Sequence, residues 1–208
     1  MTFIPTILMT DDTFLTLREP STGMYKEKGS KFLSFAIPID SEEKVKEALE
    51  ALKKEYYDAR HHCYAYMLGK DQLVFRANDA GEPNHSAGDP ILGQIRSYQL
   101  TNLLVVVVRY FGGTKLGVGG LILAYKTAAA MAIGNGIIEE QILKKEINLH
   151  FAYIAMNDVM QLVKEYDLEL VAQDFQLSCS ITLLVRRSLE NIIVSKLAEI
   201  ASVDIAEN

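Results

Sequence analysis

The apolar residues in the last third of the chain follow a helical period in two segments, and β-rich runs surround these segments. In the first segment they recur at i, i+3, i+4 and i+7, as Val159, Leu162, Val163 and Tyr166. We expect Asn157 to cap this helix and Ser188 to cap the second one, because their side chains accept hydrogen bonds from first-turn N–H groups. The β-rich runs are 145–154, 168–175, 178–185 and 202–206. The order β-α-β-β-α-β predicts a ferredoxin-like domain with both helices on one face of an antiparallel sheet.

The first part of the chain is less regular, and its elements are predicted from separate signals. Strand-forming residues dominate three runs, 31–39, 61–68 and 72–76. The last two predict a hairpin around Gly69. Ser41 precedes a helical apolar pattern and is the expected N-cap of that helix. Asp89 and Pro90 predict a second helix start, with Asp89 as the N-cap and the proline at the first helical position.

An apolar run at 103–109 shows no alternation and therefore predicts a strand buried on both faces. A glycine loop at 112–120 and an alanine-rich helix follow it. This order points unblocked backbone N–H groups and a helix N-terminus at an anion such as phosphate, with Arg109 and Lys115 as counter-charges. The loop matches neither GxxxxGK[ST] nor GxGxxG. The alternative is that these glycines only allow a tight crossover packed on the sheet.

Glycine is unevenly distributed and marks a change of architecture. Eleven of the thirteen glycines lie between Gly69 and Gly136, and none follows Gly136. We therefore place a domain boundary near residues 135–142. The expected fold class is α+β, with an N-terminal domain at 1–138 and a C-terminal domain at 139–208.

Composition places the chain among ordinary globular proteins. It has 208 residues, 49% hydrophobic and 23% charged, enough for one large domain or two small ones. The two cysteines, Cys63 and Cys179, lie far apart and outside any CxxC motif, which favours a reducing compartment and a cytoplasmic location. The first ten residues lack the basic start of a secretion signal. The longest aliphatic run, 103–108, is far shorter than a membrane span, so no membrane partner is expected.

Charge is distributed unevenly. The formal net charge is −6, which disfavours a protein that coats nucleic acid with its whole surface. Residues 60–126, however, carry seven basic and four acidic side chains, a local excess of +3 that leaves −9 for the remainder. Five tyrosines are interleaved with these cations: Tyr64, Tyr66, Tyr98, Tyr110 and Tyr125. They either stack bases beside phosphate-binding cations or belong to the core.

A second group of reactive side chains lies around His61. On a strand, His61 and Cys63 share one face, so with His85 they suggest a possible zinc site, although no CxxC or HExxH motif accompanies them. The same region suggests a hydrolase with His61 as base, Asp79 or Glu82 orienting it, and Ser86 or Cys63 as nucleophile. No nucleophile elbow is present. We expect no metal site, no cofactor and no catalytic residue. The simpler interpretation is that one of the two neighbouring histidines is hydrogen-bonded in a cleft and the other is solvated.

Several ordered motifs in the chain resemble the YigZ branch of the IMPACT family. They are Lys28-Gly29-Ser30-Lys31-Phe32, Ala59-Arg60-His61-His62-Cys63-Tyr64-Ala65-Tyr66, Asp79-Ala80-Gly81-Glu82-Pro83, Ala87-Gly88-Asp89-Pro90-Ile91-Leu92 and the segment 105–121. The resemblance implies an N-terminal ribosomal protein S5 domain 2-like fold and a ferredoxin-like C-terminal domain akin to those of elongation factor G. This chain departs from the family pattern at one position, since family members often have Asp where this chain has Ala80.

The resemblance also implies a class of function. Eukaryotic relatives regulate translation under starvation by competing for an activator of an initiation-factor kinase, whereas nucleic-acid or ribosome association of the bacterial branch is inferred from fold kinship. The family's signature positions map to His61, Asp79, Gly81, Glu82, Pro83, Arg109, Gly112, Gly113, Gly117 and Gly120.

From these observations we predict a translation-associated regulatory protein that binds RNA or a ribosome-associated partner through a cleft in its first domain. The expected nucleic-acid or phosphate-binding residues are Arg60, His61, Asp79, Glu82, Arg109, Gly112, Gly113, Lys115, Gly117 and Gly120. One alternative is a phosphoryl-transfer or hydrolytic enzyme that uses the loop 112–120 on a small molecule. Another is a protein-interaction regulator that binds no nucleic acid. The sequence leaves the oligomeric state open.

Overall fold

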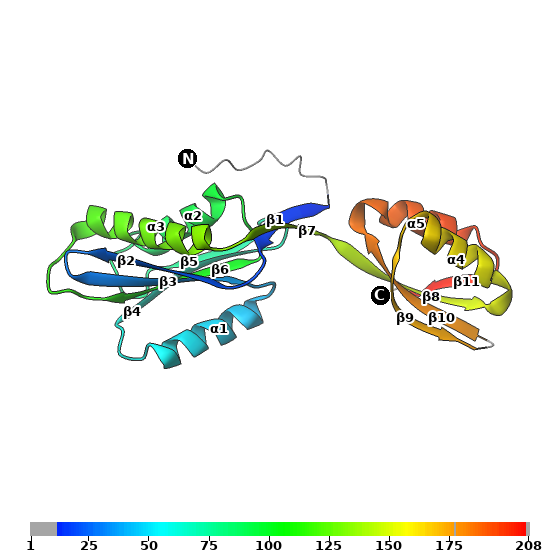
Figure 1. Cartoon of the computed structure of the whole chain (residues 1–208), viewed down its shortest axis with the longest axis horizontal. Helices are drawn as coiled ribbons and strands as arrows, with labels where there is room; N and C mark the ends of the chain where they lie inside the picture. Colours follow the sequence, from blue (N-terminus) through cyan, green and yellow to red (C-terminus); the bar gives the residue numbers. More distant parts are fainter. Residues whose placement is uncertain (1–11, 177, 207–208) are drawn as a thin grey trace. The chain divides into compact units, whose positions relative to one another are not determined.

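The computed structural model describes residues 12–176 and 178–206, and the chain divides into two compact units (Figure 1). The first unit is residues 14–141, and the second is residues 142–206 together with Asp12 and Thr13. The N-terminal segment for which no secretion signal was expected lies outside the described residues. The α+β class is confirmed, because each unit combines one main sheet with helices.

The first unit contains a five-stranded antiparallel sheet in the order β2-β3-β6-β4-β5. Its strands are β2 (Ser21–Glu27), β3 (Ser30–Pro38), β4 (His61–Leu68), β5 (Val74–Asn78) and β6 (Leu103–Tyr110). The predicted hairpin around Gly69 is confirmed by the pairing of β4 with β5. β6 is the central strand and is buried from Leu103 to Arg109, as its unbroken apolar sequence predicts.

Helices cover both faces of this sheet (Figure 1). They are α1 (Glu42–Glu55), α2 (Gly88–Ser97) and α3 (Gly117–Asn135). Val45 and Leu52 of α1 pack on one face with Val106 and Val108. The helices α2 and α3 pack on the other face, where the neighbouring positions of β6 point. A small separate pair joins β1 (Thr13–Leu17) with β7 (Ile138–Ile142).

The second unit contains the predicted order β-α-β-β-α-β. Its elements are β8 (Lys144–Ala152), a 3₁₀ turn η1 (Tyr153–Ala155), α4 (Met156–Glu165), β9 (Glu169–Phe175), β10 (Ser178–Arg186), a second 3₁₀ turn η2 (Arg187–Leu189), α5 (Glu190–Ala198) and β11 (Val203–Ala206). The sheet order is β11-β8-β10-β9, and all pairs are antiparallel. Both helices pack on one face through a core that includes Val159, Ile193 and Leu183 (Figure 1).

The predicted helix caps are partly wrong. Ser41 caps α1 as expected, since its hydroxyl accepts a hydrogen bond from the Lys44 N–H at 3.3 Å. Of the other three predicted caps, Asn157 and Asp89 lie two positions past the true cap, and Ser188 lies one position before it. Ala155 precedes α4, Leu189 precedes α5 and Ala87 precedes α2, so Asn157 and Asp89 are inside their helices and Ser188 is in η2. In each case the chain enters a helical or 3₁₀ turn before the polar side chain that we expected to start it.

Among the helices of the described residues, α3 alone has the length and apolar composition of a membrane span. The uninterrupted aliphatic run used in the sequence analysis did not identify this segment. One side of α3, with Ala124, Tyr125, Ala128 and Ile133, is fully buried in the core of the first unit. Its apolar composition therefore has a structural explanation in the packing of this helix on the sheet.

Candidate functional site

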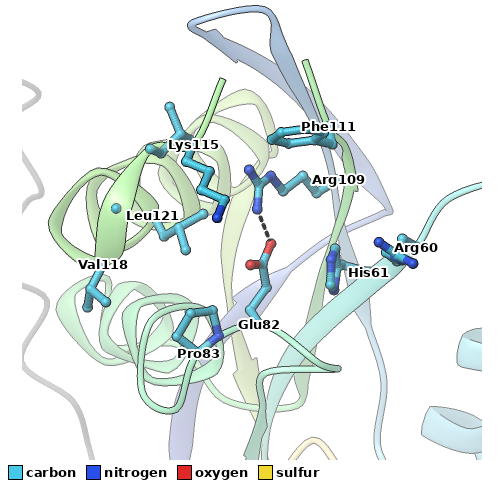
Figure 2. A pocket seen from close by; sticks show the side chains of 11 residues that line it. Arg60, His61, Glu82, Pro83, Arg109, Phe111, Lys115, Val118 and Leu121 are labelled. Carbon is cyan, nitrogen blue, oxygen red and sulfur yellow. Dashed lines mark hydrogen bonds and ion pairs between the residues drawn. The ribbon is translucent and has the colours of Figure 1, made fainter. Parts of the chain in front are cut away.

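A cavity of about 520 Å³ lies in the first unit, at the end of the sheet where β6 ends and β4 begins (Figure 2). Strand register places these two ends together, because His61 is the partner of Arg109 across β4 and β6. Glu82 and Pro83 enter from the loop before α2, and the first turn of α3 supplies the opposite wall. Three segments that are far apart in the sequence thus meet at one pocket.

Glu82 and Arg109 form a buried ion pair in this pocket. The Arg109 Nη1 donates to Glu82 Oε1 at 2.5 Å, and both side chains are more than nine-tenths buried. The guanidinium also lies over the rings of Phe32 and Phe111, with 5.5 and 5.6 Å between the guanidinium carbon and the ring centroids. Arg109 Nε is buried and has no hydrogen-bond partner. The charge of Arg109 is therefore already matched, whereas one of its donors is unused.

Beneath the ion pair lies a chain of buried polar groups. The Tyr125 hydroxyl donates to Glu82 Oε1 at 2.8 Å, and the Cys63 Sγ lies 3.3 Å from the Tyr125 oxygen. Cys63 Sγ also donates to the Asp79 carbonyl oxygen at 3.0 Å. Burial raises the pKa of Cys63 to about 12 and also raises the pKa of Tyr125. Both groups are consequently neutral at physiological pH and fix the position of the Glu82 carboxylate.

His61 is held by the backbone of the neighbouring loop. Its Nδ1 lies 3.0 Å from the Ala80 carbonyl oxygen. A carbonyl oxygen only accepts, so the ring donates this hydrogen bond through Nδ1–H. Gly81, at φ +85°, lies against this ring, and a Cβ added to it would lie 3.6 Å from His61 Nδ1. His61 therefore lies in a cleft as a hydrogen-bonded wall residue.

Two exposed cations lie at the pocket, Lys115 and Arg60. Figure 2 shows Lys115 reaching over the pocket toward the Glu82–Arg109 pair. Within the described part of the chain, neither cation forms an ion pair. The first turn of α3, which begins at Gly117, has no side-chain cap and no acidic residue. The N–H groups of this turn and the two cations give the pocket a positive rim.

One glycine of the predicted loop, Gly112, serves packing. A Cβ on Gly112 would lie 1.8 Å from the backbone carbon of Gly29, in the turn between β2 and β3, so only glycine fits there. Gly112, Gly113 and Gly120 are outside the pocket lining, and only Gly117 of the predicted glycines belongs to it. The tight-packing interpretation therefore applies to Gly112, and the candidate phosphate position is confined to the start of α3.

Asp79 also lies outside the pocket lining and has a structural role. Its Oδ1 accepts from the N–H groups of Ala87 and Gly88, and its Oδ2 accepts from His85 N–H, at 2.8–2.9 Å. Burial alone would raise the pKa of Asp79, but these three donors outweigh it and the pKa is lowered. Asp79 thus caps α2 from a distance, in the place where we had expected Asp89.

The zinc and hydrolase arrangements are not formed. The His85 side chain contacts Asp89 and not Cys63 in its hydrogen bond, since 2.6 Å separates His85 Nδ1 from Asp89 Oδ2. In residues 12–176 and 178–206 no group of three or more His, Cys, Asp or Glu side chains could hold a metal ion. Ser86 is fully buried and its hydroxyl donates to the Pro83 carbonyl. No nucleophile–base pair joins His61 to Ser86 or Cys63 in the hydrogen bonds of the described residues.

Sequence reasoning missed the aromatic side chain at the pocket. Of the five interleaved tyrosines, Tyr66 and Tyr125 are core residues. Phe111 is 58% exposed and lines the pocket beside Arg109. Phe111 directly follows the buried strand and precedes the glycines. This position was the available signal for an exposed aromatic residue, because the chain leaves the core where the buried strand ends.

Comparison with known proteins assigns the chain to a family. The Impact N-terminal domain matches residues 28–133, which include every residue of the pocket. The chain belongs to the IMPACT family. It is 31% identical to the IMPACT family member YigZ of Escherichia coli over 79% of this chain and 82% of that protein. It is 32% identical to the IMPACT family member YvyE of Bacillus subtilis, over 64% of this chain and 61% of that protein's length.

A solved structure extends the likeness of this IMPACT family protein beyond the matched domain. The crystal structure of a hypothetical protein superposes with a TM-score of 0.71 at 27% identity, covering 96% of this chain and 98% of the other. Both units are therefore shared with a known fold. The names S5 domain 2-like and elongation factor G-like stay predictions.

Proposed function

We propose that this IMPACT family protein is a translation-associated regulator that binds RNA through the pocket of its first unit. Family membership supports the link to translation, because eukaryotic IMPACT relatives regulate it. The local excess of positive charge in residues 60–126 supports a polyanionic partner at this place and not over the whole acidic surface. RNA contributes both phosphates and bases, and the pocket offers groups for each.

One observation carries the proposal. An uncapped helix N-terminus and two cations without ion pairs line the same cavity as the buried Glu82–Arg109 pair. Helix N-termini bind phosphate because their N–H groups are unsatisfied and the helix dipole favours negative charge.

The exposed ring of Phe111 completes the site. It lies over the Arg109 guanidinium at the edge of the pocket, where a base of a bound strand can stack on its free face. Base–aromatic stacking tolerates any base, so the proposed binding is to single-stranded RNA with little sequence preference.

The test uses a fluorescein-labelled ten-nucleotide oligouridylate, rU10, with binding followed by anisotropy at two salt concentrations. We expect Lys115→Ala and Arg60→Ala each to weaken binding by about five- to tenfold and to reduce its salt dependence. Lys126→Ala is the matched control, because Lys126 is exposed on α3 but outside the pocket lining. Arg109→Ala is unsuitable, since it leaves Glu82 unpaired.

Absence of rU10 binding, or an equal effect of Lys115→Ala and Lys126→Ala, would overturn the proposal. A pulldown from lysate with and without nuclease then separates RNA from protein partners. Partners retained after nuclease treatment, without rU10 binding, would favour the protein-interaction alternative.

A further inference from the structure

The Glu82 carboxylate keeps one oxygen free at the floor of the pocket. Arg109 Nη1 and the Tyr125 hydroxyl both donate to Oε1. Within residues 12–176 and 178–206 no hydrogen bond engages Oε2, and this oxygen is not among the fully buried polar atoms that lack a partner. Oε2 therefore retains contact with the cavity, although the Glu82 side chain is only 4% exposed. An acceptor so far withdrawn from water favours a ligand that donates to it.

Apolar side chains make up much of the lining of the same cavity. They are Pro83, Phe111, Leu116, Val118 and Leu121. Figure 2 shows the Glu82 oxygen that is not bonded to Arg109 on the side of the pocket where Pro83 and Leu121 lie. A phosphate at the rim makes no use of these walls, because a charged group gains nothing from leaving water for an apolar surface. The interior therefore favours a second part of the ligand, with apolar faces and a donor at its edge.

Common donor groups differ in how well they suit Glu82 Oε2. An ammonium group carries a charge that Arg109 and Lys115 would repel. A sugar hydroxyl donates, but the other polar oxygens of the sugar would face apolar walls without partners. A nucleobase has two apolar faces and at least one N–H at its Watson–Crick edge, in uracil as in the other three bases of RNA. The base therefore matches both the walls and the floor.

The dimensions of the cavity suit one nucleotide. Its volume of about 520 Å³ lies in the range of about 300–1,000 Å³ that holds a ligand of drug size. A base that fills the interior places its own phosphate toward the opening, where Lys115, Arg60 and the first turn of α3 form the positive rim. A neighbouring nucleotide then lies outside, where its base can stack on the exposed ring of Phe111.

We propose that the pocket takes up one unpaired nucleotide of the RNA, with the base between the apolar walls, a base N–H donating to Glu82 Oε2 and the phosphate at the positive rim. This inference rests on the proposed function and names the part of the RNA that enters the pocket. It keeps the expected tolerance of any base, because each base has such an N–H. It also requires single-stranded RNA, since the edge that meets Glu82 is the edge that pairs in a duplex.

The experiment uses the wild-type protein with fluorescein-labelled rU10 bound and follows the displacement of this probe by mononucleotides. Uridine 5′-monophosphate, UMP, is compared with its N3-methyl and 5-methyl derivatives. The two derivatives have the same size and charge, but only the 5-methyl form retains the N3–H donor. We expect UMP and 5-methyl-UMP to displace rU10, and N3-methyl-UMP to be about tenfold weaker, because it leaves Glu82 Oε2 without a donor.

Two tryptophan substitutions test whether the base enters this pocket. Val118 lines the cavity from the first turn of α3 and is 52% exposed, so Val118→Trp fills the cavity without displacing core side chains. Leu123→Trp is the matched control, because Leu123 is 58% exposed on the same helix and outside the pocket lining. We expect Val118→Trp to weaken rU10 binding about tenfold, because the contacts of the inserted base are lost, and Leu123→Trp to leave it unchanged.

The outcomes separate the two proposals. If N3-methyl-UMP displaces rU10 as well as 5-methyl-UMP does, or if both tryptophan variants bind rU10 equally, the inserted base is excluded and RNA binding at the rim stands. Failure of UMP to displace bound rU10 has the same meaning. Tighter binding of UMP than of rU10 would identify a free nucleotide as the ligand and overturn the proposed function. Failure of rU10 to bind at all would overturn both proposals.

Discussion

The two units use their sheets differently. The five-stranded sheet of the first unit is covered on both faces, and its central strand β6 is buried at each successive position from Leu103 to Arg109. The four-stranded sheet of the second unit is covered on one face, and β10 alternates between buried and partly exposed residues. The pocket lies in the first unit, where a fully buried strand emerges from the sheet and must expose its next residues. Burial on both faces thus places a packed scaffold directly behind the loop that lines the pocket.

The largest expected effect tests this difference directly. We expect lysine substitutions at the neighbouring positions Val106 and Val107 each to cost about 5 kcal/mol or more of unfolding free energy, because each buries an unpaired charge. In β10 only one of two neighbours should be sensitive. Leu183→Lys should be severely destabilising, whereas Leu184→Lys should be tolerated, since Leu184 is partly exposed between Glu146 and Glu169. Urea denaturation followed by circular dichroism measures all four. A tolerated lysine at Val106 or Val107 would contradict the two-sided burial of β6.

The ion pairs of the two units should also differ in how much they contribute to the free energy of unfolding. Arg109→Ala removes one partner of a buried pair, and we expect a loss of about 3–5 kcal/mol because Glu82 is left buried and unpaired. Lys144→Ala removes one partner of the Lys144–Glu169 pair in the second unit, where both side chains are well exposed. Solvent screens that pair, so its removal should not move the denaturation midpoint measurably. Similar losses in the two variants would show that the Glu82–Arg109 pair is open to solvent.

A smaller effect is expected at Asp79. Asp79→Ala leaves three backbone N–H groups without their acceptor, and we expect a cost of about 2 kcal/mol at pH 7. Because the folded-state pKa of Asp79 is lowered, its stabilisation is fully present above the ordinary value of 3.8 and is lost as the pH falls through the lowered value. The difference between wild type and variant should therefore shrink below about pH 4. Denaturation curves at several pH values measure it, and a difference independent of pH would exclude this cap.

The smallest effect concerns the cysteines, since each unit contains one. Both Cys63 and Cys179 are fully buried, and the pKa of Cys63 is raised to about 12. Neither thiol should react with iodoacetamide at pH 8 in the native protein, while both should react in denaturant. Mass spectrometry of the two peptides reports the opening of each unit separately. Modification of native Cys63 at the rate of a free thiol would contradict the buried network beneath the pocket.

Much of the fold could be predicted from the sequence, because periodicity reports burial. The unbroken apolar run of β6 and the helical spacing of α4 both predicted the right element. The helix starts were less predictable. Asp89 follows the usual sequence pattern for a cap, yet the acceptor for the first turn of α2 comes from Asp79, eight to nine residues earlier than the N–H groups it binds. A cap supplied across a loop leaves no local signal.

The sequence predicted the cations of the candidate site but not the ion pair between Glu82 and Arg109. The sequence placed Arg109 and Lys115 beside a glycine loop, and both line the pocket. It could not show that Glu82 matches the charge of Arg109, because that contact depends on how the loop before α2 packs against the end of β6. Nor could it distinguish Gly117, which lines the pocket, from Gly112, which faces the Gly29 backbone.

The contact between Gly29 and Gly112 also restricts the register of β3 against β6. A slip of β3 by two residues against β6 would keep every side chain on its own face, so the hydrophobic pattern alone does not forbid it. Such a slip would bring a residue with a Cβ into the place of Gly29, where that atom would lie only 2.8 Å from the Gly112 carbonyl oxygen. The correct pairing is thus the one in which two glycines meet. The loop that places Phe111 and Lys115 at the pocket thus also disfavours a shifted pairing of β3 with β6.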